Sequence, residues 1–420
     1  MKNVFSGFYN PSDQSLKTAW KSETTLFVFD TSTLINLYGY ATQTRDDFFS
    51  ILEKIEDNIW IPYHVGIEYQ KRRLGAVKEE KAVFSKINAC IKSINSVFDD
   101  DFKELNLNRR FPALHTKTEK LQSDINKHIS KYNRSVSTLD KKQPCVRGHD
   151  SIRETIDTFF NDKVGNIPEN QKWLDDIYSE GEERYKIKVP PGYMDTNKGK
   201  AKTPQFVYSG LLYERKYGDF IIWKQIMEKA ENENIKAVIF ITDDAKEDWW
   251  YKLDSRGDKI IGPRAELREE ICKNSKIDIF TIYNTSDFLS AGKDLLNVNI
   301  SNDSVSDAET TFKFNISNIA MEKYQHLFQD DSDDVMKFYK DTTLLNQFKK
   351  QYDLLEKYDL KSTIDKISRV GEITSLDDKL RLEKQISKHK NLRDMLKKTA
   401  IARANLEREI SNDDDIDENQ

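Results

Sequence analysis

Acidic residues stand at the ends of two strongly apolar segments and inside two helix-like ones. Asp30 closes TLFVFD, Asp243 and Asp244 close IKAVIFITDD, Glu68 lies in PYHVGIEYQ, and Asp219 lies in KYGDFIIW. The apolar runs predict buried parallel strands, whose carboxyl ends open onto the ligand crevice of an α/β sheet. Carboxylates gathered there would repel one another and raise each other's pKa unless a cation neutralised them. Hard oxygen ligands of this kind are expected to bind Mg²⁺ or Mn²⁺.

Composition and charge narrow the classes of function. The 420 residues favour about two to three domains, and 33% charged against 37% hydrophobic residues predict a soluble protein with charged helical surfaces. The net charge of -5 means that nucleic acid would have to be bound by local basic patches. Cys90, Cys145 and Cys272 form no CxxC pair, so neither a zinc site nor a disulfide framework is expected. No segment resembles a signal peptide or approaches the roughly 18 apolar residues of a membrane span. We therefore expect a cytoplasmic protein without membrane contact.

The alternation of strand and helix signals predicts the fold class. Strands are expected at 24–30, 58–62, 236–242 and 277–282, and helices at about 33–56, from Pro62 past Lys81, at 219–232 and at 263–275. Such βα alternation is typical of a three-layer α/β/α sandwich with a central parallel sheet.

Two long stretches depart from this alternation. Residues 86–204 are polar and helix-prone, which predicts a large helical insertion that ends in a Gly/Pro/Lys loop at 186–204. Beyond the domain expected at 1–300, strand signals cease and 301–410 predict a helical C-terminal domain. Residues 411–420 are an acidic segment expected to be disordered.

The order of the motifs resembles that of the PIN-like nucleases, in particular the bacterial PIN-like group with a long insertion, a domain of unknown function. The likeness covers about residues 1–295 and rests on FVFDTSTLINLYGY, DNIWIPYHVGIEYQKRR, VPPGYMD, YGDFIIW and FITDDAKEDWW. It implies a PIN fold whose acidic cluster binds divalent metal and cleaves phosphodiester bonds, usually in RNA. The family's first three acids fall on Asp30, Glu68 and Asp219. Its Thr-x-Asp pattern falls on Thr242 and Asp244, with Asp243 as the alternative fourth ligand. Ser32 stands where the family usually has Asn.

The resemblance also implies a mechanism. Two divalent ions about 4 Å apart would activate a water and stabilise the leaving oxygen, which would leave a 5′-phosphate and a 3′-hydroxyl. Asp30, at a rigid strand end, is expected to be the central ligand, and Glu68 would reach across from a helix. Asp219 and Asp244 would complete the site, partly through water. Thr242 is expected to orient an acid or a water, with Thr31 and Asp248 as further supporting residues.

Basic residues near these acids are candidates for binding the phosphate backbone. They are Lys71, Arg72 and Arg73 after Glu68, and Lys198, Lys200 and Lys202 in the 186–204 loop. The loop is equally well interpreted as a solvated, flexible segment.

Other functions remain open on the sequence. The resemblance favours RNA over DNA and a defence, antiviral or toxin-type effector, and the C-terminal helices are candidate surfaces for a homo-oligomer or a protein partner. The alternative is a catalytically silent PIN-fold module that binds nucleic acid or protein under the control of a partner. A phosphatase of the haloacid dehalogenase type is disfavoured because its second acid would fall on Ser32.

Overall fold

The structure is a computed structural model that describes residues 1, 4–232, 234–254, 258–275 and 277–325. It divides into two compact units, residues 1–254 with 258–316, and residues 255–257 with 317–420. Almost all of the second unit lies outside the described residues. Of the helical domain expected at 301–410, only the part up to residue 325 is described, and it belongs to helix α13 (Asn302–Gln325). The acidic segment 411–420 lies outside the described residues.

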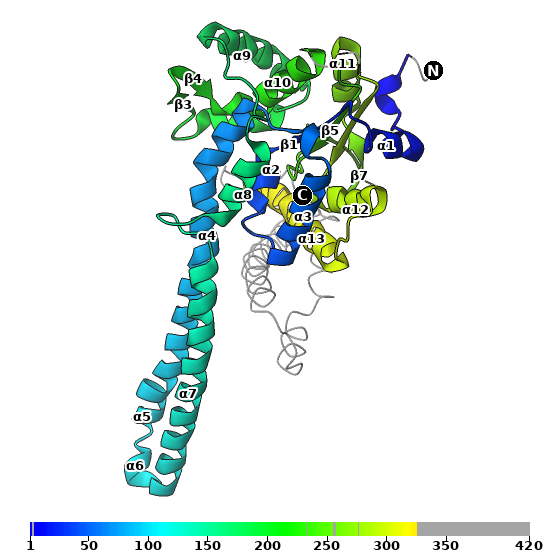
Figure 1. Cartoon of the computed structure of the whole chain (residues 1–420). Helices are drawn as coiled ribbons and strands as arrows, with labels where there is room; N and C mark the ends of the chain where they lie inside the picture. Colours follow the sequence, from blue (N-terminus) through cyan, green and yellow to red (C-terminus); the bar gives the residue numbers. More distant parts are fainter. Residues whose placement is uncertain (2–3, 233, 255–257, 276, 326–420) are drawn as a thin grey trace, which may run out of the picture. The chain divides into compact units, whose positions relative to one another are not determined.

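A four-stranded parallel sheet in the order β2-β1-β5-β8 forms the centre of the first unit (Figure 1). The strands are β1 (Thr25–Phe29), β2 (Ile59–Trp60), β5 (Ala237–Ile241) and β8 (Ile279–Tyr283). Every residue of β1 and β5 is buried, and the two strands pair in register from Thr25↔Ala237 to Phe29↔Ile241. Because they are parallel neighbours of equal length, the residues that follow them, Asp30 and Thr242, meet at the same edge of the sheet.

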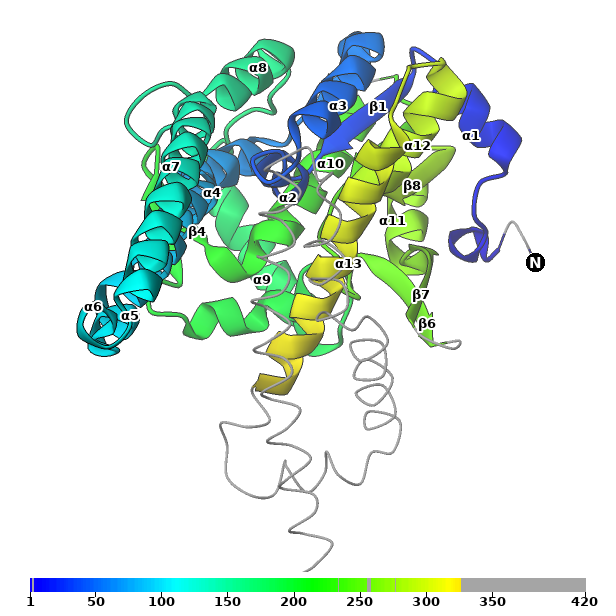
Figure 2. The ribbon, with the colours of Figure 1, turned by 90° about the horizontal axis from the view of Figure 1, so that it is seen from below.

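Helices cover both faces of the sheet. Helices α3 (Thr42–Lys54) and α12 (Thr285–Leu296) lie on the near side in Figure 2, with α10 (Gly218–Asn232) and α11 (Ala265–Ser275) behind. Phe288 of α12 packs against Phe29 and Phe48, with ring centroids 5.5 and 5.3 Å away, while Trp223 of α10 packs against Phe280 at 5.3 Å. The predicted three-layer α/β/α sandwich with a parallel sheet is confirmed.

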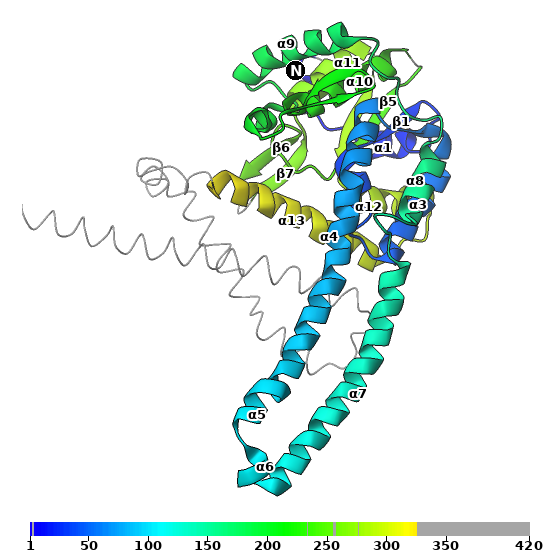
Figure 3. The ribbon, with the colours of Figure 1, turned by 90° about the vertical axis from the view of Figure 1, so that its left-hand side faces the viewer.

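The insertion is built on the helix that carries Glu68. Helix α4 (Tyr63–Ser96) is continuous over 34 residues, and α7 (Pro112–Lys142) runs back beside it (Figures 1 and 3). Ile87, Ile91 and Val136 are buried along this pair, and a Lys81–Asp140 ion pair of 3.0 Å joins the two helices. The sequence predicted an insertion from about residue 86, but α4 passes that position without a break. The α4–α7 pair is therefore a direct extension of the helix that holds Glu68.

Smaller elements complete the described chain: η1 (Ser6–Phe8), α1 (Asp13–Ala19), α2 (Thr31–Asn36), η2 (Glu56–Asn58), η3 (Val97–Asp101), α5 (Phe102–Glu104), α6 (Leu107–Arg110), α8 (Ser151–Phe160), α9 (Gln171–Lys186), η4 (Tyr193–Lys200), β3 (Gln205–Tyr208), β4 (Leu211–Glu214), η5 (Arg215–Tyr217), β6 (Trp250–Asp254) and β7 (Asp258–Pro263). None of the described helices combines the length and the apolarity needed to cross a bilayer.

The structure corrects several predicted elements. The helical region expected at about 33–56 consists of two helices, α2 and α3. Part of the loop expected at 186–204 is the 3-10 helix η4, in which Tyr193 and Asp195 are buried. The hairpins β3–β4 and β6–β7 were not predicted. Ser209 and Gly210 join β3 to β4 with φ of 50° and 78°, the left-handed pair that a tight hairpin turn requires.

Candidate active site

Asp30 is fixed at the end of β1, where it caps helix α2. Its Oδ2 accepts hydrogen bonds from Ser32 Oγ at 2.6 Å and Thr242 Oγ1 at 2.8 Å. Thr242 follows β5, so this second bond joins the ends of the two central strands. Burial raises the pKa of Asp30 to about 6; the Ser32 hydrogen bond opposes the rise, and the charges of Asp219 and Asp244 add to it. The carboxyl is thus rigid, desolvated and close to other acids.

Glu68 reaches the same edge of the sheet from α4. Its Oε2 accepts a hydrogen bond of 2.9 Å from Thr31 Oγ1, on the residue next to Asp30, and its Oε1 lies 3.7 Å from His64 Nε2. Burial works against the charged form of Glu68, but His64, Lys198 and Arg72 together lower its pKa.

Gly218 allows the start of α10 to pack against α4. A Cβ at this position would lie 3.0 Å from Glu68 Oε1 and 3.3 Å from His64 Nε2, closer than a side chain can be accommodated without movement. The absence of a side chain at Gly218 brings Asp219, in the first turn of α10, next to Glu68. Burial raises the pKa of Asp219, with Asp195 and Glu68 adding to the rise and Lys246 opposing it.

Lys246 joins three carboxylates that come from separate elements. Its Nζ lies 2.6 Å from Asp244 Oδ2, 3.0 Å from Asp195 Oδ1 and 3.6 Å from Asp219 Oδ2. Burial alone would lower the pKa of Lys246, but Asp244, Asp219 and Asp195 outweigh it and raise that pKa well above the ordinary value. Lys246 is therefore the counter-ion of this half of the cluster.

Asp195 is a fifth acid that the sequence analysis missed. It lies in η4, is 4% exposed and forms an ion pair with Lys198 of the same turn as well as with Lys246. The only signal was its place in VPPGYMD, a motif that contributed to the family resemblance without a residue role.

Asp248 holds the segment that carries Asp195. Its Oδ2 accepts hydrogen bonds from the backbone N–H groups of Gly192, at 3.0 Å, and Met194, at 3.1 Å. Gly192 has φ of 93°, and a Cβ there would collide with the Tyr185 hydroxyl and lie 3.3 Å from Asp219 Cβ. Burial and then the Asp219 charge raise the pKa of Asp248 to about 7. Asp248, expected as a supporting residue, thus accepts hydrogen bonds from the backbone of the turn that carries Asp195.

The neighbouring acids Asp243 and Asp244 have different surroundings. Asp243 is 1% exposed and accepts hydrogen bonds from Asn36 Nδ2 at 2.8 Å, Tyr40 Oη at 3.2 Å, and Thr285 N and Oγ1 at 2.9 and 2.7 Å. Both of its carboxylate oxygens therefore already accept hydrogen bonds from other residues of the protein. Asp244 is in contact with Lys246 and is the member of the pair that belongs to the cluster.

The candidate phosphate-binding residues divide into three groups. Arg73 forms a 3.1 Å ion pair with the buried Asp150, so its charge is used inside the fold. Lys198 is about half exposed, at 47%, beside Asp195. The remaining four, Lys71, Arg72, Lys200 and Lys202, are exposed.

The donor chemistry fits a hard divalent cation. Asp30, Glu68, Asp219 and Asp244 offer carboxylate oxygens only, the ligands that Mg²⁺ and Mn²⁺ prefer. Asp219 Oδ2 is buried and has no hydrogen-bond partner among the described residues, with Lys246 Nζ 3.6 Å away, so a metal ion could bind it directly and offset its desolvation cost. As the side chains stand, however, no three His, Cys, Asp or Glu of the described residues form a group that could hold a metal ion. The Lys246 ammonium lies 3.6 Å from Asp219 and 2.6 Å from Asp244, two of the acids that would have to close around an ion.

Replacement of Lys246 by Met is expected to make stability depend on divalent ions. Removing one partner of a buried ion pair costs about 3 kcal/mol, so in chelator the variant should unfold at a lower temperature than the wild type. Mg²⁺ or Mn²⁺ should stabilise it more than the wild type, because the ion then replaces the lost charge. Thermal unfolding with chelator and with each ion measures both effects. Lys224→Met, which removes the ion pair between Lys224 of α10 and Glu180 of α9, is the control. Equal unfolding temperatures for Lys246→Met and the wild type in chelator would contradict this role.

The raised pKa of Asp30 predicts a pH-dependent stability in chelator. The folded protein binds the Asp30 proton more tightly than the unfolded chain does, so ionisation disfavours folding. The penalty is absent below the ordinary pKa of 3.8 and complete above about 6, where it amounts to about 3 kcal/mol. Asp30→Asn lacks it. Unfolding measured from pH 4 to 8 should therefore show the variant gaining on the wild type as the pH rises through this window; a constant difference would rule the effect out.

A family model described as a PIN like domain matches residues 26–267. The match covers more than half of the chain, begins in β1 and ends in α11, and so contains all five acids of the cluster. Neither the curated proteins nor the solved structures that were compared gave a match. PIN domains are commonly nucleases, which fits an acidic cluster at the carboxyl edge of a parallel sheet. By its sheet topology and by this match, the chain belongs to the PIN-like domain family.

Proposed function

We propose that this protein is a divalent-metal-dependent endonuclease that hydrolyses phosphodiester bonds, with RNA as the favoured substrate. The observation that carries the proposal is the convergence of acids from far-apart segments. Thr31, which follows Asp30, donates a hydrogen bond to Glu68. Gly218, which precedes Asp219, packs against Glu68. The charges of Asp219 and Asp244 both raise the pKa of Asp30. Buried carboxylates that repel one another do not stabilise a fold, and such groups are found at functional sites.

The chain's own residues have distinct tasks in this proposal. Asp30, Glu68, Asp219 and Asp244 would hold Mg²⁺ or Mn²⁺; when bound, the ion would supply an activated water and neutralise charge on the phosphate. Ser32 and Thr242 hold one oxygen of Asp30 still, and Thr31 does the same for Glu68. Lys198, partly open to solvent, adds its positive charge to that of Lys246 beside the acids.

The second candidate is a catalytically silent PIN-fold module that binds nucleic acid or a protein. The observation in its favour is Lys246, whose ammonium group lies among three of the acids. A built-in cation satisfies these carboxylates without any metal.

Cleavage assays separate the two candidates. The full chain is incubated with labelled single- and double-stranded RNA and DNA, each with Mg²⁺, Mn²⁺ or chelator. The nuclease proposal predicts cleavage, of RNA first, that needs the divalent ion and stops in chelator. Binding of these nucleic acids without cleavage in either metal would favour the silent module.

A further inference from the structure

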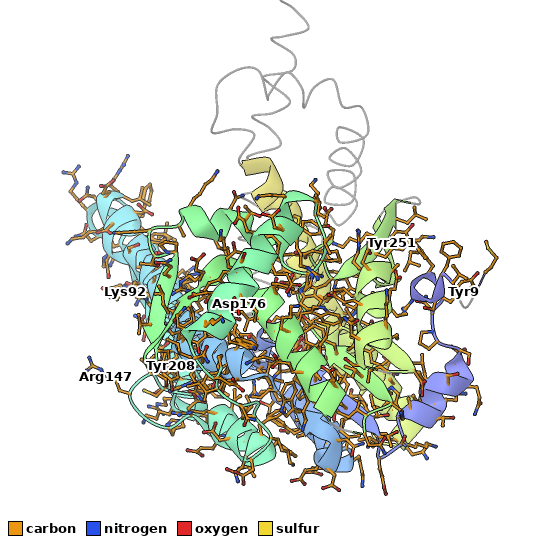
Figure 4. All side chains as sticks on the ribbon, turned by 90° about the horizontal axis from the view of Figure 1, so that it is seen from above. Tyr9, Lys92, Arg147, Asp176, Tyr208 and Tyr251 are labelled. Carbon is orange, nitrogen blue, oxygen red and sulfur yellow. The ribbon has the colours of Figure 1, made fainter. Side chains whose placement is uncertain are left out.

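A series of aromatic rings runs from the acid cluster to the β3–β4 hairpin. From Glu68, the series begins with His64, whose Nε2 lies 3.7 Å from Glu68 Oε1. The His64 ring lies 5.5 Å from that of Tyr213, and Tyr213 stacks on Phe206 at 5.1 Å with an interplanar angle of 13°. These rings lead from the candidate active site to the exposed part of the hairpin, which presents Tyr208 at 48% exposure (Figure 4).

Two cations from outside the hairpin, Lys71 of α4 and Arg215 of η5, lie against its Phe206 ring. Lys71 Nζ is 3.5 Å from the centroid of the Phe206 ring, and the guanidinium carbon of Arg215 is 5.3 Å from it. Lys71 and Arg215 are both exposed, and neither forms an ion pair within the described part of the chain. The Phe206 ring stabilises both charges, but the two like charges repel each other. Burial, and then the Arg215 charge, accordingly lower the pKa of Lys71. Two like charges held at one ring are what an anion would bridge.

A cavity adjoins the hairpin, and both Lys71 and Tyr208 line it. It has a volume of about 600 Å³, a size typical of small-ligand sites, and its other lining residues come from α4, α8, Ile61 and the segment that holds Asn161, Asp162 and Val164. Tyr63 and Tyr208 supply aromatic surface, and Gln70 and Asn161 supply amides that can bond to the edge of a base. Asp157 and Asp162 also line it. Their charge disfavours a phosphate deep in the cavity but not a neutral base, whose phosphate would lie beside Lys71, towards Arg215.

We propose that α4 and the β3–β4 hairpin form a nucleotide-binding subsite, in which an unpaired base enters the cavity beside Tyr208 and its phosphate contacts Lys71 and Arg215. The inference deepens the proposed function and rests on it for the identity of the ligand. A base within a duplex is stacked and would first have to flip out, whereas a single strand offers its bases to aromatic rings and its phosphates to cations. Lys71 places one part of the subsite within one helical turn of Glu68, because it is three residues further along α4.

The test measures binding in chelator, so that cleavage does not enter. Fluorescence anisotropy with a labelled single-stranded RNA compares the full-length wild type with Tyr208→Ala and Lys71→Gln. Two controls are matched to them: Val207→Ala, the exposed neighbour of Tyr208 on the opposite side of its strand, and Lys92→Gln, an exposed lysine farther along the same helix (Figure 4). Unfolding temperatures confirm that all four variants fold.

Each subsite variant is expected to weaken binding by about 10-fold, and Lys71→Gln should also reduce the dependence of binding on salt concentration. The two controls should stay within about twofold of the wild type. The subsite is wrong if Tyr208→Ala and Lys71→Gln bind like the wild type, or if the controls lose as much. Normal binding by the subsite variants with metal-dependent cleavage intact would overturn the subsite and leave the nuclease proposal standing. If the subsite variants bind more weakly but the wild type cleaves nothing, the subsite stands and the nuclease proposal is wrong.

Discussion

Asp30→Asn is expected to lower the rate of divalent-dependent cleavage by about a thousandfold while the protein remains folded. A bound ion stabilises the transition state by several kcal/mol, and loss of about 4 kcal/mol is a thousandfold in rate. Asn keeps a carbonyl oxygen that can accept the Ser32 and Thr242 hydrogen bonds, so the end of β1 should keep its geometry. What the substitution removes is the negative charge at the centre of the cluster.

Single-turnover cleavage of a labelled substrate measures this loss, with circular dichroism and the unfolding temperature as checks on the fold. Asp46→Asn, an exposed aspartate on α3, is the matched control and should keep its rate within about twofold. If Asp30→Asn retained substantial divalent-dependent activity, the assignment of Asp30 as central ligand would fail.

Asp243→Asn is expected to lower stability and Asp244→Asn to stop cleavage, although the two residues are neighbours in sequence. Asp243 accepts four hydrogen bonds in a buried site, and an amide cannot accept on its nitrogen, so donors lose their partners. We expect a loss of about 3 kcal/mol in the free energy of unfolding, or roughly 6–10 °C in unfolding temperature. Asp244→Asn should unfold close to the wild-type temperature, since the lost Lys246 contact is offset by reduced repulsion, but should lose cleavage.

The comparison needs both measurements on both variants. Thermal unfolding and the cleavage rate should show a destabilised protein for Asp243→Asn and a stable, inactive one for Asp244→Asn. The opposite assignment, with Asp244→Asn destabilised and Asp243→Asn stable and inactive, would mean that the fourth acid of the site is Asp243.

The sequence predicted the sheet and the acids at its edge because both depend on short-range patterns. Two wholly apolar runs, each followed by an acid, indicate parallel strands, and parallel strands end at one edge of the sheet. The β1–β5 register then brings Asp30 next to Thr242 across 212 residues of chain. Glu68 and Asp219 needed the family resemblance, since an acid on a helix is ordinarily a solvated residue.

The other half of the cluster was not predictable from pattern. Asp195 lies in an irregular, lysine-rich stretch whose path depends on the bonds from Gly192 and Met194 to Asp248, and no periodicity marks such contacts. Lys246 was visible in FITDDAKEDWW, but a lysine near aspartates is common in charged segments. Its role depends on Asp195 and Asp219, which come from other parts of the chain.

The sequence analysis missed the two hairpins for a related reason. The β3 residues are mostly exposed, so the strand lacks the alternation that marks a half-buried strand. Its stability comes instead from the Phe206–Tyr213 stack and from packing near α4. The start expected for the insertion, at about residue 86, falls inside α4, because one continuous helix serves both the sheet and the α4–α7 pair.

The most direct measurement of whether the acids hold a divalent ion is the anomalous scattering of manganese in crystals of the wild-type protein grown with Mn²⁺. We expect a manganese peak bounded by the carboxylates of Asp30, Glu68, Asp219 and Asp244, with the Lys246 ammonium moved away from its place among the acids. A well-ordered cluster with no manganese peak, and with Lys246 still in contact with Asp195 and Asp244, would contradict the account.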